Sequence, residues 1–298
     1  MSVLAQHAIR EAYVSGETTR PITTLAPGKL YALQHPYALD GRVSSYPLSA
    51  RGFSVANSYL LTQTDAAMLI DTGFGKDEPA IRAQIETLIA QRLPLSLFPL
   101  RLNEFMSINN VETFAGHFNV EQCYTSNIDA ALWFDFGAKT DGRSILDAMP
   151  VTAVTRSDTI ELGKEGRPIR VMQAPIRLIA TRWLYDEATR TLFSSDMFTH
   201  VWRAGADGPW MVTDHDDTTS ARELRSFLLN TRYWWLEVRR GIAEVFDSCD
   251  VETIAPGYGC ILHGRNVVKR HLRMLDQVLK ELDKKVAVSR YVGRDEER

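Results

Sequence analysis

The chain has little cysteine, and its apolar residues are spread out. Its three cysteines (Cys123, Cys249 and Cys260) form no C-x-x-C pair, which argues against a disulfide framework or a zinc–thiolate site. No run of about 18 apolar residues occurs, so no transmembrane helix is predicted. Residues 1–11 mix Gln, His, Arg and Glu where a secretory signal needs an apolar core. These absences favour a cytoplasmic protein.

The chain also lacks a large excess of charge of either sign. The 34 Lys and Arg residues nearly balance 37 Asp and Glu residues, for a net charge of −3. Neither nucleic acid nor an acidic membrane is therefore an expected partner. With 45% hydrophobic and 24% charged residues, the composition is that of an ordinary globular protein. A small molecule is the expected ligand.

Low-complexity tracts, helical repeats and linkers are absent from the 298 residues, which favours one compact domain. We expect that domain to span residues 28–285. Residues 1–27 are expected to form an N-terminal extension, and residues 286–298 a charged tail. A homodimer is compatible with the adjacent indoles of Trp234 and Trp235, which cannot both face one core.

Hydrophobic periodicity predicts the order of the elements. Strand-like segments come first, and residues 53–62 and 66–70 are predicted to form a hairpin. A helix over residues 76–92 follows this hairpin, and further short strands fill the middle of the chain. Residues 220–246 and 267–282 have the three-and-four spacing of long amphipathic helices, with a strand near residues 251–255 between them. Two groups of strands with helices predict a layered α/β fold, two sheets packed face to face with helices outside. The other predicted strands are residues 29–33, 53–62, 66–70, 95–100, 151–154, 169–172, 178–185 and 191–195.

Four segments occur in a familiar order along the chain. They are Asn57-Ser58-Tyr59-Leu60-Leu61, Leu69-Ile70-Asp71-Thr72-Gly73, Leu192-Phe193-Ser194-Ser195-Asp196-Met197-Phe198 and Pro256-Gly257-Tyr258-Gly259-Cys260-Ile261-Leu262. Together they resemble the metallo-β-lactamase superfamily, in its flavodiiron and oxygen-binding diiron branch. The resemblance implies an α/β fold of the metallo-β-lactamase type, an αββα sandwich of two mixed sheets with helices on the outer faces and the site at one sheet edge.

The resemblance also implies where two irons would bind, and the chain departs from that pattern. The branch uses an H-x-E-x-D-H motif, a strand His, an Asp after a later strand and a final His. This chain has Glu104 in the motif and keeps the Asp as Asp196. Non-ligating residues stand at the other positions: Leu102, Met106 and Ser107 in the motif, Arg177 for the strand His and Tyr258 for the final His. No metal ligand set is therefore expected, because such sites need imidazoles as well as carboxylates.

Two carboxylates facing one cavity repel each other unless a cation lies between them. We expect the guanidinium of Arg177 to supply that cation, bridging Glu104 and Asp196. The catalytic candidates are then Glu104 or Asp196 as base, Tyr258 as proton donor, and Arg177 to orient an anionic group. Alternatively, Arg177 and Asp196 form only a structural salt bridge in a site that has lost its activity.

Apolar and aromatic residues near these positions would suit an organic ligand. The expected ligand-binding residues are Leu102, Phe105, Met106, Trp183, His200 and His263. His117 is a further candidate for a base or ligand. The segment Asp214-His215-Asp216-Asp217 precedes a helix, and capping of that helix explains it.

Three functions follow as alternatives. The first is a metal-independent acid–base enzyme of hydrolase, isomerase or lyase type that acts on a small organic molecule and needs no cofactor. The second is a non-catalytic ligand-binding or sensor protein. The third is a metal-dependent hydrolase or diiron oxidoreductase with iron or zinc in a rebuilt site.

Overall fold

The computed structural model describes residues 22–41, 43, 46–127, 130, 149–175, 181–231 and 235–286. The expected tail lies outside this part apart from Val286, and so does most of the expected extension, residues 1–21. The side chains of Trp234 and Trp235 lie outside it as well. Ile22–Ala26, inside the expected extension, forms the edge strand β1 of the first sheet.

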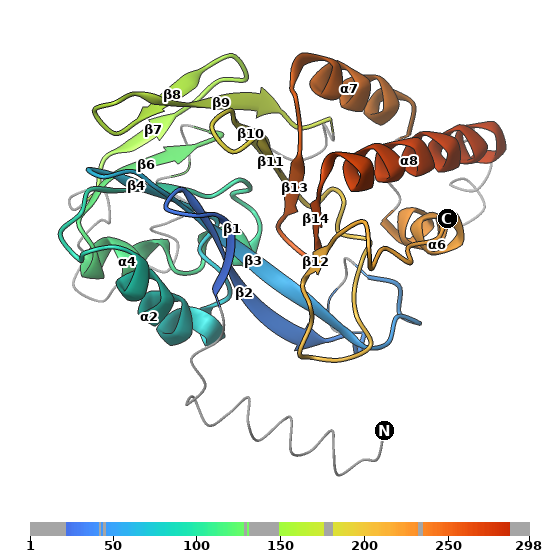
Figure 1. Ribbon diagram of the computed structural model, residues 1–298, viewed down its shortest axis with the longest axis horizontal. Helices are drawn as coiled ribbons and strands as arrows, with labels where there is room; N and C mark the ends of the chain where they lie inside the picture. Colours follow the sequence, from blue (N-terminus) through green and yellow to red (C-terminus); the bar gives the residue numbers. More distant parts are fainter. Residues whose placement is uncertain are drawn as a thin grey trace, which may run out of the picture.

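Two seven-stranded mixed sheets make up the centre of the molecule (Figure 1). The first has the order β1-β2-β3-β4-β5-β6-β7, antiparallel from β1 to β4 and parallel from β4 to β7. Its strands after β1 are β2 (Leu30–Ala38), β3 (Phe53–Thr62), β4 (Ala67–Ile70), β5 (Leu95–Phe98), β6 (Val120–Thr125) and β7 (Val151–Ala153). The predicted hairpin of residues 53–70 is the β3–β4 pair.

The second sheet has the order β12-β14-β13-β11-β10-β9-β8. Within it β11 and β13 run parallel, whereas β8, β9, β10 and β11 pair antiparallel in sequence. Its strands are β8 (Thr159–Leu162), β9 (Arg167–Gln173), β10 (Arg182–Asp186), β11 (Thr191–Ser195), β12 (Met211–Val212), β13 (Thr253–Pro256) and β14 (Ile261–His263).

Helices cover the outer face of each sheet (Figure 1). Helices α2 (Glu78–Leu88) and α4 (Val111–His117) pack on the first sheet, with short segments η1 (Gly75–Asp77) and α3 (Phe105–Ile108) near its edge. Helices α6 (Ala221–Thr231), α7 (Trp235–Ser248) and α8 (Arg265–Val286) pack on the second. The expectation of one long helix over residues 220–246 is wrong, because α6 and α7 lie on opposite sides of α8 (Figure 1).

Side-chain alternation along the strands builds three apolar layers. On β11, Leu192 faces α6, α7 and α8, whereas its neighbour Phe193 faces the first sheet. On β13, Ile254 and Ala255 divide in the same way. A further cluster packs Ile81 of α2 against the outer face of the first sheet. The order is helix, sheet, sheet, helix, as the sequence predicts.

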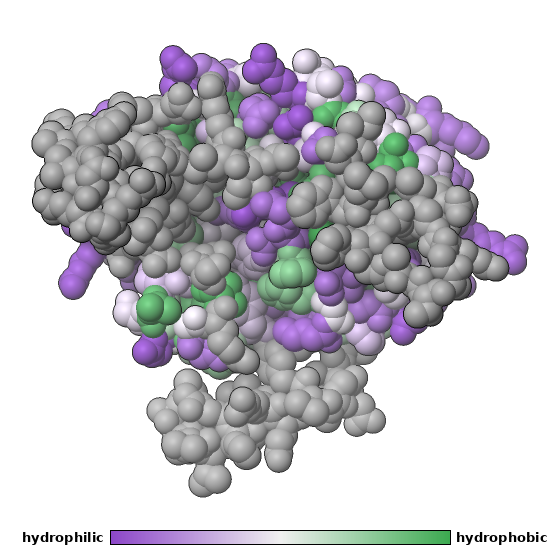
Figure 2. Space-filling model, turned by 180° about the vertical axis from the view of Figure 1, so that it is seen from behind, coloured by the Kyte–Doolittle hydropathy of each residue, from purple (hydrophilic) through white to green (hydrophobic). Residues whose placement is uncertain are grey.

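The exterior agrees with this layering. Seen from behind, the described surface is mostly hydrophilic, with hydrophobic residues in separate patches (Figure 2). No helix in the described ranges is long and apolar enough to cross a bilayer.

Candidate functional site

Four strands present polar residues just beyond their carboxyl ends. Asp71 follows β4, and Arg101 and Glu104 follow β5. Asp196 follows β11, and Tyr258 follows β13. Because β4 runs parallel to β5 and β11 runs parallel to β13, each pair of strands ends at a common edge. The structure brings these residues together there, at the edge that the sequence indicates.

Tight backbone packing fixes the position of Tyr258. A Cβ atom on Gly257 would lie 2.7 Å from the Met106 methyl carbon, and one on Gly259 would lie 2.7 Å from the Val201 carbonyl oxygen. Gly259 also has φ +78°, which favours glycine. The Asn57 side chain donates to the carbonyl oxygens of Pro256 and Gly259, both at 2.9 Å. The two sheets are therefore joined directly beneath the phenol.

Asp196 is held by a turn at the end of β11. The Met197 amide donates to the Ser194 carbonyl oxygen at 3.1 Å, and the Thr199 hydroxyl donates to the Asp196 carbonyl oxygen at 3.1 Å. Ser195 and Phe198 have positive φ angles of 49° and 65°. Two non-glycine residues in this region mark a constrained turn, which is common where a side chain is held for function.

Arg101 supplies the positive charge of the site. Its Nη1 atom contacts Asp196 Oδ2 and lies 3.5 Å from Glu104 Oε2. Its Nε atom donates to Asn103 Oδ1 at 3.2 Å. The side chains of Arg101 and Asp196 are each 14% exposed and that of Glu104 is 24% exposed, so solvent screens these charges only in part. A guanidinium bridge between the two acids is present, and Arg101 makes it.

The Tyr258 hydroxyl donates a hydrogen bond to Glu104 Oε1 at 2.5 Å. Burial, followed by the negative charge of Glu104, raises the pKa of Tyr258 well above its ordinary value. Tyr258 therefore keeps its proton at neutral pH and acts as a hydrogen-bond donor. Its ring packs against Tyr37 and Phe74, with centroid distances of 6.4 and 6.1 Å.

Asp71 lies fully buried behind this cluster. Its Oδ1 atom accepts the Leu100 amide at 2.9 Å, which fixes the start of the segment that carries Arg101. Burial raises the pKa of Asp71 to about 7, although the Ser107 side chain and the hydrogen bond from the Leu100 amide lower it, and Glu104 raises it further. Asp71 therefore ties the end of β4 to the segment that follows β5.

The residues present do not fit the iron centre that the fold implies. Arg101 lies against both acids, and a guanidinium has donors and no acceptor. Leu102, Met106 and Ser107 are buried without offering an imidazole or carboxylate. In the part of the chain that the structure describes, no three His, Cys, Asp or Glu side chains gather as a metal-binding group.

The predicted apolar ligand-binding residues have different environments. Phe105, next to Glu104, is 74% exposed. Leu102, Met106 and Trp183 are buried, and Trp183 belongs to the core beneath α6, α7 and α8. The indole N–H of Trp183 has no hydrogen-bond partner among the described residues. Of this group only Phe105 offers a large exposed surface beside the acids.

The histidine candidates lie away from Arg101 and have other partners. His200 Nε2 lies 2.9 Å from His271 Nδ1 in the core. His263 Nδ1 bonds the Thr253 hydroxyl at 2.9 Å, at the end of β13 opposite to Tyr258. His117 Nε2 lies 2.7 Å from Glu86 at the surface. The structure does not bring these three histidines to the acid pair.

The acidic segment before α6 has structural contacts. Asp217 accepts the Thr219 amide at 3.0 Å, and Asp216 accepts the Thr213 amide at 2.6 Å. Ser220 and Glu223 form a reciprocal cap at the start of α6. The cap of α6 thus comes from Ser220 and Glu223, after the predicted segment. Asp216 and Asp217 themselves pair with Arg203, Arg270 and His271.

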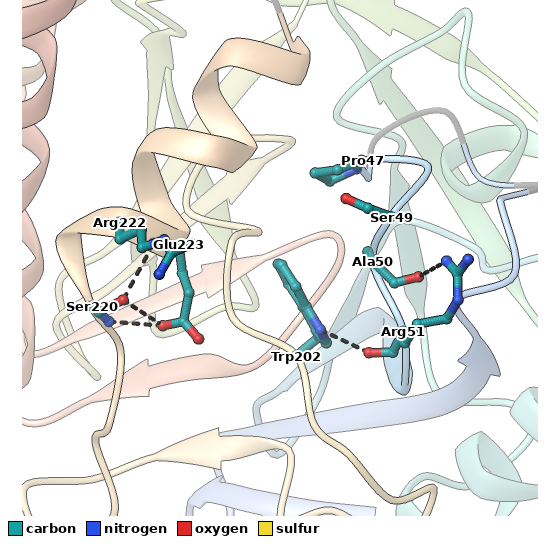
Figure 3. A pocket seen from close by; sticks show the side chains of 8 residues that line it. All are labelled: Pro47, Ser49, Ala50, Arg51, Trp202, Ser220, Arg222 and Glu223. Carbon is teal, nitrogen blue, oxygen red and sulfur yellow. Dashed lines mark hydrogen bonds between the residues drawn. The ribbon is translucent and has the colours of Figure 1, made fainter.

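Two surface cavities lie apart from the Arg101 cluster. One, of about 460 Å³, lies between residues 47–51 and the start of α6, with Trp202 at its centre (Figure 3). The Trp202 indole donates to the Arg51 carbonyl oxygen at 3.1 Å (Figure 3). The other, of about 510 Å³, lies between β9 and α7. Among the predicted catalytic and ligand-binding residues that the structure describes, none lines either cavity.

Arg177 lies outside the described residues, so the structure does not place it. The cation that the structure does place, Arg101, was missed from the sequence. Its position three residues before Glu104 is the one signal that indicates it. An isolated antiparallel β-bridge pairs Arg101, which follows β5, with Thr181, which precedes β10. This bridge fixes the position of the Arg101 backbone.

Solved structures of similar fold include flavodiiron proteins. Rubredoxin oxygen:oxidoreductase from Desulfovibrio gigas is 17% identical with a TM-score of 0.69, over 87% of this chain and 62% of that chain. The flavodiiron protein from Giardia intestinalis is 15% identical with a TM-score of 0.65, over 88% and 60%. This chain thus spans about three fifths of those proteins.

The chemotaxis sensor ODP, solved with a peroxy diiron species, is 15% identical with a TM-score of 0.59, over 86% of this chain and 94% of that chain. No family model and no curated protein matches the chain. At these identities the likeness establishes the fold alone. The chain has the metallo-β-lactamase-like fold of the flavodiiron proteins, as the sequence motifs predict.

Proposed function

We propose that the chain is a metal-independent acid–base enzyme of hydrolase, isomerase or lyase type, acting on a small organic molecule at Arg101, Glu104, Asp196 and Tyr258. The observation that carries this proposal is the Arg101 guanidinium, which contacts Asp196 and lies 3.5 Å from Glu104. A permanent cation there permits two carboxylates to stay ionised side by side.

Glu104 fits the role of base better than Asp196. It is the more exposed of the two acids, and its contact with Arg101 is the looser one. Tyr258 donates to the same carboxylate, so a base and a hydrogen-bond donor stand together. Once Glu104 has accepted a proton, the phenol can turn its single O–H from Glu104 toward negative charge developing on a substrate. Asp196 anchors Arg101.

The proposal is tested by following mixtures of small carbonyl compounds and esters by ¹H NMR with chelator-dialysed protein. We expect turnover by the wild type and a loss in kcat of about 10²–10⁴-fold for Glu104→Gln, the range typical of general bases. Tyr258→Phe should lower kcat as well. Arg265→Met, which removes a surface ion pair with Asp250 and Glu252, is the control and should be neutral.

Full turnover by both Glu104→Gln and Tyr258→Phe would refute the proposed roles. Loss of turnover on dialysis, with recovery on adding iron or zinc, would favour the rebuilt metal site instead.

Ligand sensing is the second candidate function. The observation in its favour is the likeness in fold to the chemotaxis sensor ODP, 94% of which the alignment covers at a TM-score of 0.59. The same NMR experiment separates the two functions. A sensor would perturb or broaden the signals of its ligand without converting it to product.

A further inference from the structure

A surface cavity of about 460 Å³ lies at Trp202, apart from the proposed active site (Figure 3). Residues 47–51, just before β3, form one wall of it, and Ser220, Arg222 and Glu223 at the start of α6 form the other. Trp202 lies between the two walls (Figure 3). Small-molecule sites in proteins have volumes of about 300–1,000 Å³, so the cavity has the size of such a site.

Trp202 gives the cavity an aromatic surface that is held in one orientation. Its indole N–H donates to the Arg51 carbonyl oxygen at 3.1 Å, and its ring meets that of Tyr46 edge to face, with centroids 5.6 Å apart. Tyr46 is buried and donates to the Thr199 carbonyl oxygen at 2.9 Å. A ring that is already fixed loses little conformational entropy when a flat ligand packs against it.

The charged residues that line the cavity are two arginines and one glutamate. Glu223 Oε2 accepts the amide and the hydroxyl of Ser220, both at 2.9 Å, so this carboxylate belongs to the cap of α6. Arg222 is exposed and has neither a hydrogen bond nor an ion pair within the part of the chain that the structure describes. Arg51 donates to two carbonyl oxygens of its own loop, both at 2.8 Å, and has no carboxylate partner among the described residues. The lining therefore has an excess of positive charge.

These features favour a ligand that is both flat and negatively charged. A guanidinium without a carboxylate partner can bind a carboxylate through two parallel hydrogen bonds. A flat ring can stack in an offset arrangement on the face of an indole. An organic cation would also be attracted to the indole, but Arg51 and Arg222 would repel it.

We infer that this cavity binds a small organic anion with a flat ring, such as an aromatic carboxylate, with the ring against Trp202 and the negative charge toward Arg222. The residues of the proposed active site do not line the cavity, so this second site is independent of the proposed function. Glu223, held in the helix cap, stays in place when the ligand binds and opposes its charge.

Three probes of matched size test the inference: 2-naphthoate, 2-naphthylmethylamine and decahydro-2-naphthoate. Their binding to the full chain is measured by isothermal titration calorimetry at pH 7.5 and low salt. We expect 2-naphthoate to bind at least about tenfold more tightly than the amine, because the amine cannot accept a hydrogen bond from a guanidinium. It should bind about two- to tenfold more tightly than the saturated carboxylate, which cannot stack on Trp202.

Two arginines of α6 provide a matched pair of variants. Arg222→Met should weaken the binding of 2-naphthoate by about tenfold. Arg225→Met, in the same helix but not in the cavity lining, should leave it unchanged. Neither side chain has a hydrogen bond or an ion pair within the described ranges, so both variants should fold normally. Since each removes one positive charge, the comparison separates a contact with the ligand from a change in net charge.

Two more variants give independent readouts. Glu223→Gln should tighten the binding of 2-naphthoate by a few-fold, because it removes the opposing charge while its amide oxygen still accepts from Ser220. Trp202→Leu should weaken the binding by about two- to tenfold.

Three results would overturn the inference. The first is no measurable binding of 2-naphthoate at about millimolar concentration. The second is equal binding of 2-naphthoate and the amine, or equal binding of 2-naphthoate by Arg222→Met and Arg225→Met. The third is loss of binding in Arg101→Met but not in Arg222→Met, which would place the anion at the proposed active site.

Discussion

At Arg101 a single side chain contacts Asp196 and lies 3.5 Å from Glu104. A hydrophobic replacement would leave these partly buried acids facing each other with no cation between them in the described structure. Exposed ion pairs contribute little to stability, whereas removing one partner from a buried pair costs several kcal/mol. The partial exposure of Arg101 places it between these limits.

We predict that Arg101→Met lowers the free energy of unfolding by about 1–3 kcal/mol, measured by urea denaturation. Adding Glu104→Gln should restore part of this loss, because it removes one of the two repelling charges. Arg265→Met, at the surface, should change stability by less than about 0.5 kcal/mol. An Arg101→Met protein as stable as the wild type would show that the bridge contributes nothing.

Asp71 gives the site a pH dependence of its own. Its pKa rises from an ordinary value of 3.8 to about 7 because it is buried. Between these two pH values the folded chain binds more protons at Asp71 than the unfolded chain. By linkage, the contribution of Asp71 to stability falls as the pH rises from about 4 to 7.

Asp71→Asn should remove that slope, since its amide oxygen can still accept the Leu100 amide. We predict that the stability of the variant relative to the wild type increases with pH across this window, by up to about 1.4 kcal/mol per pH unit. Unfolding free energies measured at intervals from pH 4 to pH 8 check this. A constant difference between the two proteins would contradict a raised pKa.

The family resemblance indicated Glu104, Asp196 and Tyr258, and the structure brings the three side chains together with Arg101. It did not find Arg101, because the pattern within one segment does not show which residue of another segment it meets. The bridge from Arg101 to Thr181 joins positions that are distant in the chain. We expected His263 to lie near the site. The pairing of β13 with β14 instead places His263 beside Thr253.

Among the elements, α6, α8 and the loop after β11 meet through a buried polar chain. Asp217, just before α6, accepts from His271 Nε2 of α8 at 2.9 Å and from Arg270. His271 Nδ1 then lies 2.9 Å from His200 Nε2 in the loop that follows Asp196. Neighbouring charges and a capping amide hold the pKa of Asp217 at about 2 despite its burial, so it is ionised.

This series of hydrogen bonds fixes the tautomers of His271 and His200. Because ionised Asp217 only accepts, His271 carries its proton on Nε2 and accepts at Nδ1. His200 must then donate from Nε2. Burial lowers the pKa of both imidazoles, and the charge of Arg270 lowers that of His271 further, against the opposing effect of Asp217. Both rings are therefore neutral in the folded protein.

A histidine whose pKa is lowered on folding stabilises the fold above its unfolded pKa of about 6.5, and that contribution is lost as the pH falls below it. We predict that His271→Gln is destabilised by about 1–3 kcal/mol at pH 7.5, since it leaves buried polar groups unpaired. The difference from wild type should shrink as the pH falls from 6.5 to 5. Exposed His117→Gln is the control, and an equal pH slope in His271→Gln and wild type would contradict the assignment.

Element order was largely predictable from periodicity, since alternating and three-and-four patterns distinguish strands from helices. The one long helix expected over residues 220–246 failed because α6 and α7 both present apolar faces to α8, so their patterns read as continuous. Periodicity alone did not show where α6 ends and α7 begins.

At the scale of the whole molecule, a second guanidinium–carboxylate pair lies at the sheet edge opposite to the site. Arg167 donates to both oxygens of Asp186, at 2.9 and 2.5 Å, and to the Lys29 and Thr62 carbonyl oxygens of the first sheet, both at 3.1 Å. Arg167 and Asp186 are almost fully buried, so this pair joins the two sheets without access to solvent.

The two pairs should respond differently to the same substitution. We predict that Arg167→Met costs about 3–5 kcal/mol of stability, more than Arg101→Met, because it strands a fully buried carboxylate. Turnover by the folded Arg167→Met protein should match the wild type, whereas Arg101→Met should lower it. Equal turnover in the two variants would indicate that Arg101 acts on stability alone.

We propose that a side-chain cation, and not a metal ion, lies between the two acids at this edge of the sheets. Metal content of the untagged protein, purified after growth with iron, zinc and manganese, tests that claim directly. We expect less than about a tenth of an equivalent of any of these metals per chain. One or two equivalents that disappear in a Glu104→Gln, Asp196→Asn double variant would contradict it.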